Sequence, residues 1–285
     1  MVIATRAAAP RRPSAALGTL SVYVVLVVGA CIMLYPFAYM LSTSLKSPAQ
    51  VYVFPPNWIP TPIMWSNYVA AFGRMGLRPF ANSFLFTSAV VLGQGMVTTM
   101  GGYAFARLKF PGRNVLFIAY LGTMMIPAVV VSIPLFVIIA RLGWQDTYQG
   151  LIVPILASGA FGTFLFRQFF MTMPEELGEA ATIDGANPLG VFWRIYLPLS
   201  KPALSAYGVI TALSAWNLYL WPLIVTQSEE LKVVTLVIAQ FSGSMNTQLN
   251  LMMAAVAISL SPIFLLYVLG QRFFVEGIAM TGLKG

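Results

Sequence analysis

Long apolar runs separated by single charged positions dominate this chain. Six stretches of about 20 or more residues contain no Asp, Glu, Lys or Arg, and each is long enough to cross a lipid hydrocarbon core as a helix. Polar and apolar residues do not alternate within them, as they would in the strands of a membrane barrel. The pattern therefore predicts an all-α membrane protein with six transmembrane helices. Their approximate limits are 17–41, 80–106, 114–140, 147–166, 203–226 and 249–271.

Composition supports this interpretation and removes several classes of function. Hydrophobic residues make up 59% of the 285 residues, charged residues only 8%, and the mean hydropathy is +0.82. A soluble domain carries about 25% charged residues. The absence of histidine excludes His-based catalytic triads and the usual zinc sites. A lone cysteine, Cys31, cannot form an internal disulfide.

The chain also lacks the residues with which a membrane protein couples its work to a proton gradient or to ATP. Its predicted spans contain no ionisable side chain, which argues against proton coupling. No G-x-x-x-x-G-K-[ST] loop is present, so we expect no enzyme activity and no cofactor in this chain. A Gly-x-Gly in the second span lacks the third glycine of a dinucleotide motif. Glycines in this span instead favour close helix packing: Gly93, Gly95, Gly101 and Gly102.

Basic residues predict the orientation in the membrane. Six spans place both ends of the sequence on one side, and the loops of that side hold eleven of the sixteen Lys and Arg residues. The positive-inside rule then predicts that both termini are cytoplasmic. The expected organisation is a cytoplasmic tail over 1–16, a six-span domain over 17–276, and a second cytoplasmic tail over 277–285. The first apolar stretch lacks a convincing cleavage site for a signal peptide and is expected to remain as a membrane anchor.

The cytoplasmic connection between the fourth and fifth spans has clear local signals. Pro174 suits the first position of a helix, and the two glutamates after it complement the helix dipole. Gly185 suits the left-handed residue that ends a helix. Asn187 then caps a second helix that opens with Pro188. Two short helices joined by a glycine corner would form an L beneath the membrane.

This connection resembles the EAA loop of binding-protein-dependent ABC importer permeases. The family pattern is E-A-A, three residues, G, nine residues, then I-x-L-P, and this chain matches it without a gap from Glu179 to Pro198. We call residues 167–201 the EAA segment. The resemblance implies the type I importer permease fold and a coupling role, in which this segment docks on a cytoplasmic ATPase. Residues expected to carry that coupling are Glu179, Ala180, Ala181, Asp184, Gly185, Ile195, Leu197 and Pro198.

Further motifs resemble the maltose-type carbohydrate importers, and in particular their shorter, six-span permease subunit. They cover nearly the whole chain: Asn82-Ser83, Tyr103–Arg107, Phe110-Pro111-Gly112, Met125-Ile126-Pro127, Pro134-Leu135, Trp216-Asn217, Trp221-Pro222-Leu223 and Gln271–Gly277. The tail 277–285 matches the family in length but differs in its middle, which weakens the expectation that it reaches the ATPase.

This resemblance implies a bacterial or archaeal inner-membrane protein that imports a carbohydrate, polyol or sugar phosphate. Its implied partners are a homologous second permease, two cytoplasmic ATP-binding subunits that hold ATP and Mg, an external solute-binding protein, and lipid, with no nucleic acid. An importer for another small solute, a membrane enzyme acting on lipid and a passive channel are the alternatives. The absence of histidine and of acidic residues within the spans argues against the enzyme, and the EAA pattern argues against the channel.

Aromatic and amide side chains of the fifth span are candidates for the substrate pathway, because sugars bind to aromatic faces and amides. They are Trp216, Asn217, Tyr219 and Trp221; Leu218 stands where the family often has an acidic residue. Anchoring at the membrane boundary is the alternative role.

Outside the membrane, Trp65, Tyr68, Val69 and Phe72 form one apolar helical face. A helix lying on the outer membrane surface is expected there, with docking of the binding protein as a secondary possibility.

Overall fold

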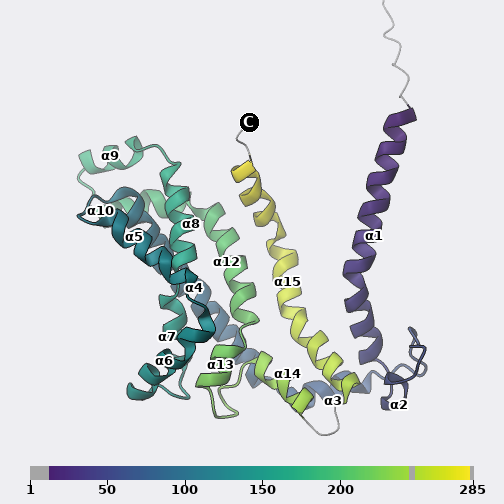
Figure 1. The fold of residues 1–285 in the computed structure, drawn as a ribbon. Helices are drawn as coiled ribbons and strands as arrows, with labels where there is room; N and C mark the ends of the chain where they lie inside the picture. Colours follow the sequence, from purple (N-terminus) through teal and green to yellow (C-terminus); the bar gives the residue numbers. More distant parts are fainter. Residues whose placement is uncertain (1–12, 244–247, 283–285) are drawn as a thin grey trace, which may run out of the picture.

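The computed structural model describes residues 13–243 and 248–282, and every regular element in them is helical (Figure 1). The longer helices are α1 (Pro13–Ser44), α3 (Ser66–Met75), α4 (Arg78–Arg107), α5 (Arg113–Gly122), α6 (Ala128–Arg141), α7 (Tyr148–Ala157), α8 (Ala160–Met171), α9 (Glu176–Ile183), α12 (Lys201–Trp216), α14 (Val234–Gly243) and α15 (Leu249–Gly282). Shorter helices are α2 (Pro48–Val51), η1 (Thr123–Met125), α10 (Pro188–Val191), η2 (Phe192–Tyr196), α11 (Leu197–Leu199) and α13 (Leu220–Val225). The all-α prediction is confirmed for these residues.

Helix α4 is the centre of the helical core and packs against α8, α12 and α7. Its glycines allow the close approach that the sequence predicts. A Cβ atom on Gly102 would lie 2.6 Å from the Cβ of Phe166, and one on Gly93 would lie 2.8 Å from a Leu156 methyl group. Gly95 differs, because no atom lies within 4 Å of its would-be Cβ. Its open side faces the groove described below.

Two predicted spans are bent where the sequence analysis assumed straight helices. The predicted span 114–140 is two helices, α5 with η1 and then α6, which meet at 102° next to Pro127. The predicted span 147–166 is divided into α7 and α8, which meet at 42°. Proline cannot donate a backbone hydrogen bond and disfavours helical backbone in the preceding residue, which explains the break at Pro127.

The second break is stabilised by a polar side chain from α4. Gln94 Nε2 donates hydrogen bonds to the carbonyl oxygens of Ile155 (2.9 Å) and Ser158 (3.3 Å), and Tyr207 of α12 donates to Gln94 Oε1 (3.0 Å). Irregular backbone at membrane depth is tolerated when neighbouring groups satisfy it. Gln94 therefore ties α4, the α7–α8 break and α12 together.

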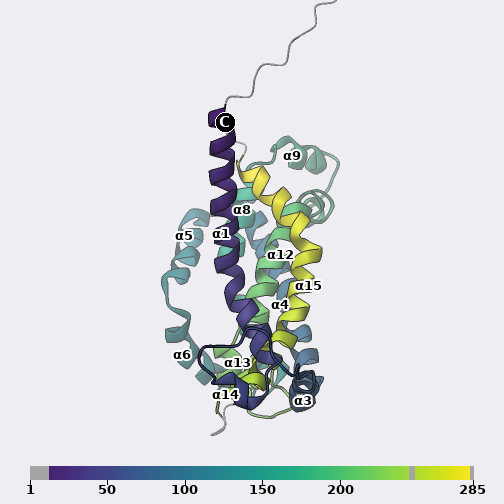
Figure 2. The same cartoon turned by 90° about the vertical axis from the view of Figure 1, so that its right-hand side faces the viewer.

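Three helices in the described residues are long and apolar enough to cross a membrane singly, and the two bent pairs raise that number to five. The predicted fifth span, 203–226, is not one helix: α12 ends at Trp216 and α13 begins at Leu220. The first spanning helix, α1, stands apart from the core and meets α15 near α3 (Figures 1 and 2). None of its apolar window is buried within this chain.

Helix α3 buries one side and exposes the other. Asn67, Ala71 and Met75 pack inward, whereas Trp65 and Val69 are 65% and 75% exposed. The predicted apolar face thus points away from the chain and is available to lipid or a partner. Of the two predicted tails, 1–12 and 283–285 lie outside the described residues, and α15 extends through 277–282.

Candidate functional site

The EAA segment folds as the sequence predicts at its corner. Gly185 ends α9 with φ +86°, and its amide donates to the Thr182 carbonyl (3.0 Å) while the Ala186 amide donates to Ala181 (2.9 Å). This pair of bonds satisfies carbonyls at the helix end in a Schellman arrangement. Asn187 caps α10 by accepting from the Gly190 amide at 2.7 Å. The second arm of the L is helical from Pro188 to Leu199, with one wider π-helical turn in its middle, η2.

The predicted coupling residues divide between two surfaces of this segment. Ala181, Ile195 and Leu197 pack toward a cluster of aromatic side chains at the end of the helical core. The other predicted residues are exposed: Glu179, Ala180, Asp184, Gly185 and Pro198. Beside them lie Ile183 and Leu189, which are 86% and 54% exposed and were not among the predicted residues. The outer surface of the L therefore combines apolar and acidic side chains (Figure 1, α9 and α10).

Six aromatic residues support the segment from beneath: Tyr103, Phe166, Phe170, Phe192, Tyr196 and Tyr207. Tyr196 is central, with its ring 5.1 Å from that of Tyr103 and 5.6 Å from that of Phe170. Burial raises the pKa of the Tyr196 phenol, an effect that nearby Arg107 opposes and Glu175 reinforces. The phenol is therefore neutral at physiological pH, and the support is an uncharged, packed surface.

A groove of about 1110 Å³ runs between α4, α12 and α15. Its walls are mainly apolar, and small side chains such as Gly95 and Gly208 line it beside Met96 and Leu204. Its polar lining residues are Thr87, Ser88, Thr99, Lys201 and Ser205. The Thr87 hydroxyl is buried and has no hydrogen-bond partner in the described residues. This groove can accept a helix or a solute that supplies the missing contacts.

The candidate substrate residues are separated by the break between α12 and α13. Trp216 lines the groove. Asn217 donates its side-chain amide to the Leu213 carbonyl (2.8 Å) at the end of α12, and Tyr219 is 42% exposed. Trp221 is only 5% exposed, and its indole nitrogen donates to the carbonyls of Gly150 and Leu151, each at 3.2 Å. A continuous helix over the predicted span 203–226 would place Asn217 and Trp221 on one face, four positions apart, but the helix ends between them, so that expectation is wrong.

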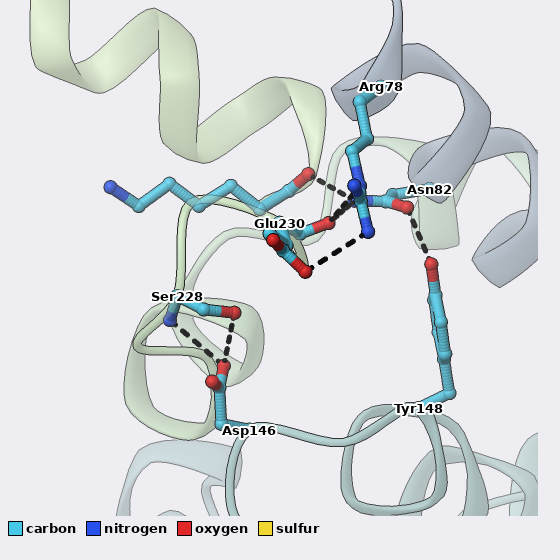
Figure 3. Close-up of polar contacts among 7 residues, drawn as sticks. Arg78, Asn82, Asp146, Tyr148, Ser228 and Glu230 are labelled. Carbon is cyan, nitrogen blue, oxygen red and sulfur yellow. Dashed lines mark hydrogen bonds and ion pairs between the residues drawn. The ribbon is translucent and has the colours of Figure 1, made fainter.

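A polar cluster at the opposite end of α4 was missed by the sequence analysis (Figure 3). Asn82 donates to the carbonyls of Glu230 (2.8 Å) and Lys232 (2.9 Å) and accepts from the Tyr148 hydroxyl (2.7 Å). Arg78 also donates to the Glu230 carbonyl, at 3.0 Å. These bonds hold the segment 226–234, which we call the outer loop, against the first turns of α4 and α7.

Asp146 holds the other end of the outer loop. Its carboxylate accepts from the Gln227 amide (2.8 Å), the Ser228 amide (3.0 Å) and the Ser228 hydroxyl (3.1 Å). Burial alone would raise the pKa of Asp146, but these hydrogen bonds outweigh it, so its pKa lies below the ordinary value. Its partners are about 80 positions away in the sequence, and no local pattern indicates them. We call the contacts of Asn82, Arg78 and Asp146 with this loop the outer latch.

A helical chain with several membrane-spanning elements, a lateral groove and an exposed L-shaped segment at one end has the architecture of a membrane permease subunit. The comparisons with known proteins define the class further. Residues 98–279 match the family described as binding-protein-dependent transport system inner membrane component. The chain belongs to this family and is a multi-pass inner-membrane permease subunit of an ABC importer, not an enzyme.

Among its relatives are permeases of the sn-glycerol-3-phosphate transport system. The sn-glycerol-3-phosphate transport system permease protein UgpE of Yersinia enterocolitica is 39% identical over 266 residues, covering 90% of this chain and 94% of the relative. UgpE of Escherichia coli O1:K1 / APEC is 36% identical over 269 residues, covering 91% and 95%. The chain is thus a permease of the carbohydrate-uptake type and a homologue of UgpE.

Solved structures agree with this fold. A chain of a bacterial ABC transporter involved in the import of the acidic polysaccharide alginate superposes with a TM-score of 0.77 and 25% identity, covering 94% of this chain and 100% of that one. A chain of an alginate ABC transporter in complex with its pentasaccharide-bound periplasmic protein superposes with a TM-score of 0.65 at 15% identity, covering 88% and 93%. The second match supports the fold alone.

Proposed function

We propose that this chain forms one half of the translocation pathway of an ATP-driven importer for a carbohydrate, polyol or sugar phosphate. A second, homologous permease supplies the other half, and an external solute-binding protein delivers the solute. Two cytoplasmic ATPase subunits bind ATP and Mg and dock on the EAA segment. The chain crosses the membrane six times with both termini in the cytoplasm. The tail 277–285 and the segment 167–201 lie on the ATPase side.

The shape of the EAA segment carries the coupling proposal. The corner at Gly185 projects α9 away from the helical core, so apolar Ile183 and acidic Asp184 stand exposed at its tip. An exposed apolar tip beside the membrane indicates a surface that a partner covers. The proposed ATPase contacts are Glu179, Ala180, Asp184, Gly185 and Pro198, while Ala181, Ile195 and Leu197 attach the segment to the permease.

The groove supports the pathway proposal. It is lateral and largely apolar, so a second permease is needed to close it, and Trp216 offers an aromatic face to a solute. Lys201 is the charged side chain among the lining residues, and no acidic residue accompanies it. One cation without a counter-charge favours an anionic solute such as a sugar phosphate over a neutral sugar. Asn217, Tyr219 and Trp221 remain proposed pathway residues, with Trp221 in contact only if α13 moves.

Replacing the corner glycine tests the coupling proposal. Gly185→Val forces a β-branched residue into the left-handed region, although no atom obstructs its Cβ, so the effect is on backbone conformation alone. We expect transport to be lost while the chain stays in the membrane. Gly76→Val is the matched control, because Gly76 has φ +70° and equally open surroundings but lies far from the EAA segment. Unchanged transport by Gly185→Val would refute the coupling role of the corner.

Affinity purification from the native membrane tests the proposed partners. Recovery of a second permease and an ATPase with this chain would support the assembly. Uptake in proteoliposomes of glycerol 3-phosphate against neutral maltose would then test the anionic solute. Equal or greater uptake of the neutral sugar would contradict the charge argument from Lys201.

A further inference from the structure

Two side chains of α4 grip the EAA segment at separate points. Tyr103 donates its hydroxyl to the Pro188 carbonyl at 3.0 Å, at the start of the second arm of the L. Arg107 donates to the carbonyls of Phe170, at 2.6 Å, and Met173, where the chain leaves α8 and enters the segment. The two residues are four positions apart and therefore share one face of α4. We call this pair the α4 clamp.

The Arg107 guanidinium is built into this position. Its side chain is 10% exposed, it stacks 5.3 Å from the centre of the Tyr196 ring, and it forms an ion pair with Glu175 at 3.3 Å. Phe170 lies in the last turn of α8, where its carbonyl also accepts from the Met173 amide (3.2 Å), and Met173 lies two positions beyond the end of the helix. A cation at a helix C-terminus also complements the helix dipole. Arg107 thus closes the end of α8 and fixes the entry to α9.

These bonds differ in kind from the apolar contacts of the segment. Ala181, Ile195 and Leu197 meet the core through apolar surfaces, which are not directional. Hydrogen bonds have a preferred distance and angle, and those of a charged donor are the stronger ones. When the EAA segment moves, its apolar contacts can shift without a large loss of energy. The hydrogen bonds of the clamp must either break or move α4 together with the segment.

Helix α4 can carry such a movement to the groove. It is a continuous helix of 30 residues, and Thr99, one turn before Tyr103, lines the groove together with Gly95 and Thr87. We propose that the α4 clamp is the mechanical link between the EAA segment and the translocation pathway. Tyr103 and Arg107 are thus positioning residues, through which a movement of the ATPase-bound EAA segment is transmitted to α4. This inference rests on the proposed coupling function of the segment.

The test uses the whole transporter: this chain, its second permease, its ATPases and its binding protein in proteoliposomes. Arg107→Gln removes the charged guanidinium group, and Tyr103→Phe removes one hydroxyl. The matched control is Arg113→Gln, because Arg113 also donates to a backbone carbonyl, that of Leu108 at 3.1 Å, and lies outside the EAA segment.

Two readouts separate a coupling defect from general damage. The first is solute transported per ATP hydrolysed. The second is the distance distribution between spin labels at Ile183→Cys on α9 and Leu92→Cys on α4, in a Cys31→Ser background; these positions are 86% and 73% exposed. For Arg107→Gln we expect transport per ATP to fall about tenfold or more, with the ATPases still bound, because hydrogen bonds to a charged group are lost.

The variants should form a graded series. Tyr103→Phe should lose about three- to tenfold, the factor for one neutral hydrogen bond. For Arg107→Lys, transport per ATP should lie between the values of wild type and Arg107→Gln. The Lys ammonium keeps the charge and reaches one carbonyl, but it lacks the planar guanidinium that donates to two. The spin-label distribution should broaden in the same order, and Arg113→Gln should match wild type in both readouts.

Wild-type stoichiometry in Arg107→Gln and Tyr103→Phe, or unchanged distance distributions, would overturn the clamp and assign coupling to the apolar contacts alone. If Arg107→Gln does not accumulate, Tyr103→Phe decides by the same criterion. Failure of the proposed function would look different: the wild-type chain itself would recruit no ATPase, before any variant is compared.

Discussion

Replacing Asn82 should release the outer loop. In Asn82→Leu, a side chain of similar size replaces one that is 3% exposed and makes three hydrogen bonds of 2.7 to 2.9 Å. The Glu230 carbonyl keeps its bond from Arg78. The carbonyls of Glu230 and Lys232 each lose the bond by which Asn82 holds the loop. Two bonds at about 1 kcal/mol each stabilise the attached loop by about 2 kcal/mol.

A loss of about 2 kcal/mol raises the open population of the loop about 30-fold. Hydrogen exchange measured by mass spectrometry detects this at the Val234 amide, which donates to Ser83 Oγ at 2.8 Å only while the loop is attached. We expect exchange over 226–234 to accelerate by about that factor, with exchange in α9 unchanged. Tyr148→Phe is the comparison variant and should produce a smaller acceleration, because it leaves both bonds from Asn82 to the loop in place and removes only a bond that orients the Asn82 amide.

The reasoning has a clear point of failure. If Asn82→Leu leaves exchange over the outer loop within about twofold of wild type, the loop is held by its apolar neighbours and not by the latch. Acceleration of equal size throughout α4 and α12 would also contradict the prediction, because it would indicate loss of the whole helical core.

Three further outcomes follow from the packing and the charges. Gly102→Ala should lower the unfolding temperature in detergent, since overpacking against Phe166 costs about 1–3 kcal/mol; Gly95→Ala, with open space around it, should not. Gln94→Leu should destabilise the chain by about 1–3 kcal/mol in the same assay, because carbonyls at the α7–α8 break lose a donor. Although burial acts to raise it, hydrogen bonds from the outer loop lower the pKa of Asp146, so its contribution is complete above the unfolded value of 3.8 and is lost as the pH falls through the lower folded value. Exchange at 227 and 228, corrected for intrinsic rates, should therefore accelerate at acid pH in wild type and lose this dependence in the Asp146→Asn variant.

Sequence reasoning succeeded where the determinants are local. The second span was expected over 80–106 and is α4, Arg78–Arg107, because charged residues mark where apolar helices leave the membrane. The corner of the EAA segment was equally readable, since Gly185 and Asn187 act on backbone within four positions of themselves. Such features need no knowledge of the rest of the fold.

It failed where the determinants are distant or where hydropathy is uninformative. Counting apolar residues cannot detect the bend of 102° between α5 with η1 and α6, although Pro127 is a local signal for a helix break. The same count joined α12 to α13 and so placed Asn217 and Trp221 on one helical face. The outer latch joins residues separated by 66 to 152 positions, and its carbonyl acceptors carry no side-chain signature in the sequence.

The positions of the two arginines of α4 restrict how this helix can move. Arg78 and Arg107 are its first and last residues, and α4 contains no other Arg and no Lys, Asp or Glu. A shift along the membrane normal would draw one guanidinium toward the hydrocarbon, where an arginine at the bilayer centre costs about 2.5–3.5 kcal/mol or more. Tilting or rotation about the helix axis leaves both charges at the water boundary. We therefore expect α4 to tilt or to rotate about its own axis during transport, with both ends held at the water boundary, and not to move along the membrane normal.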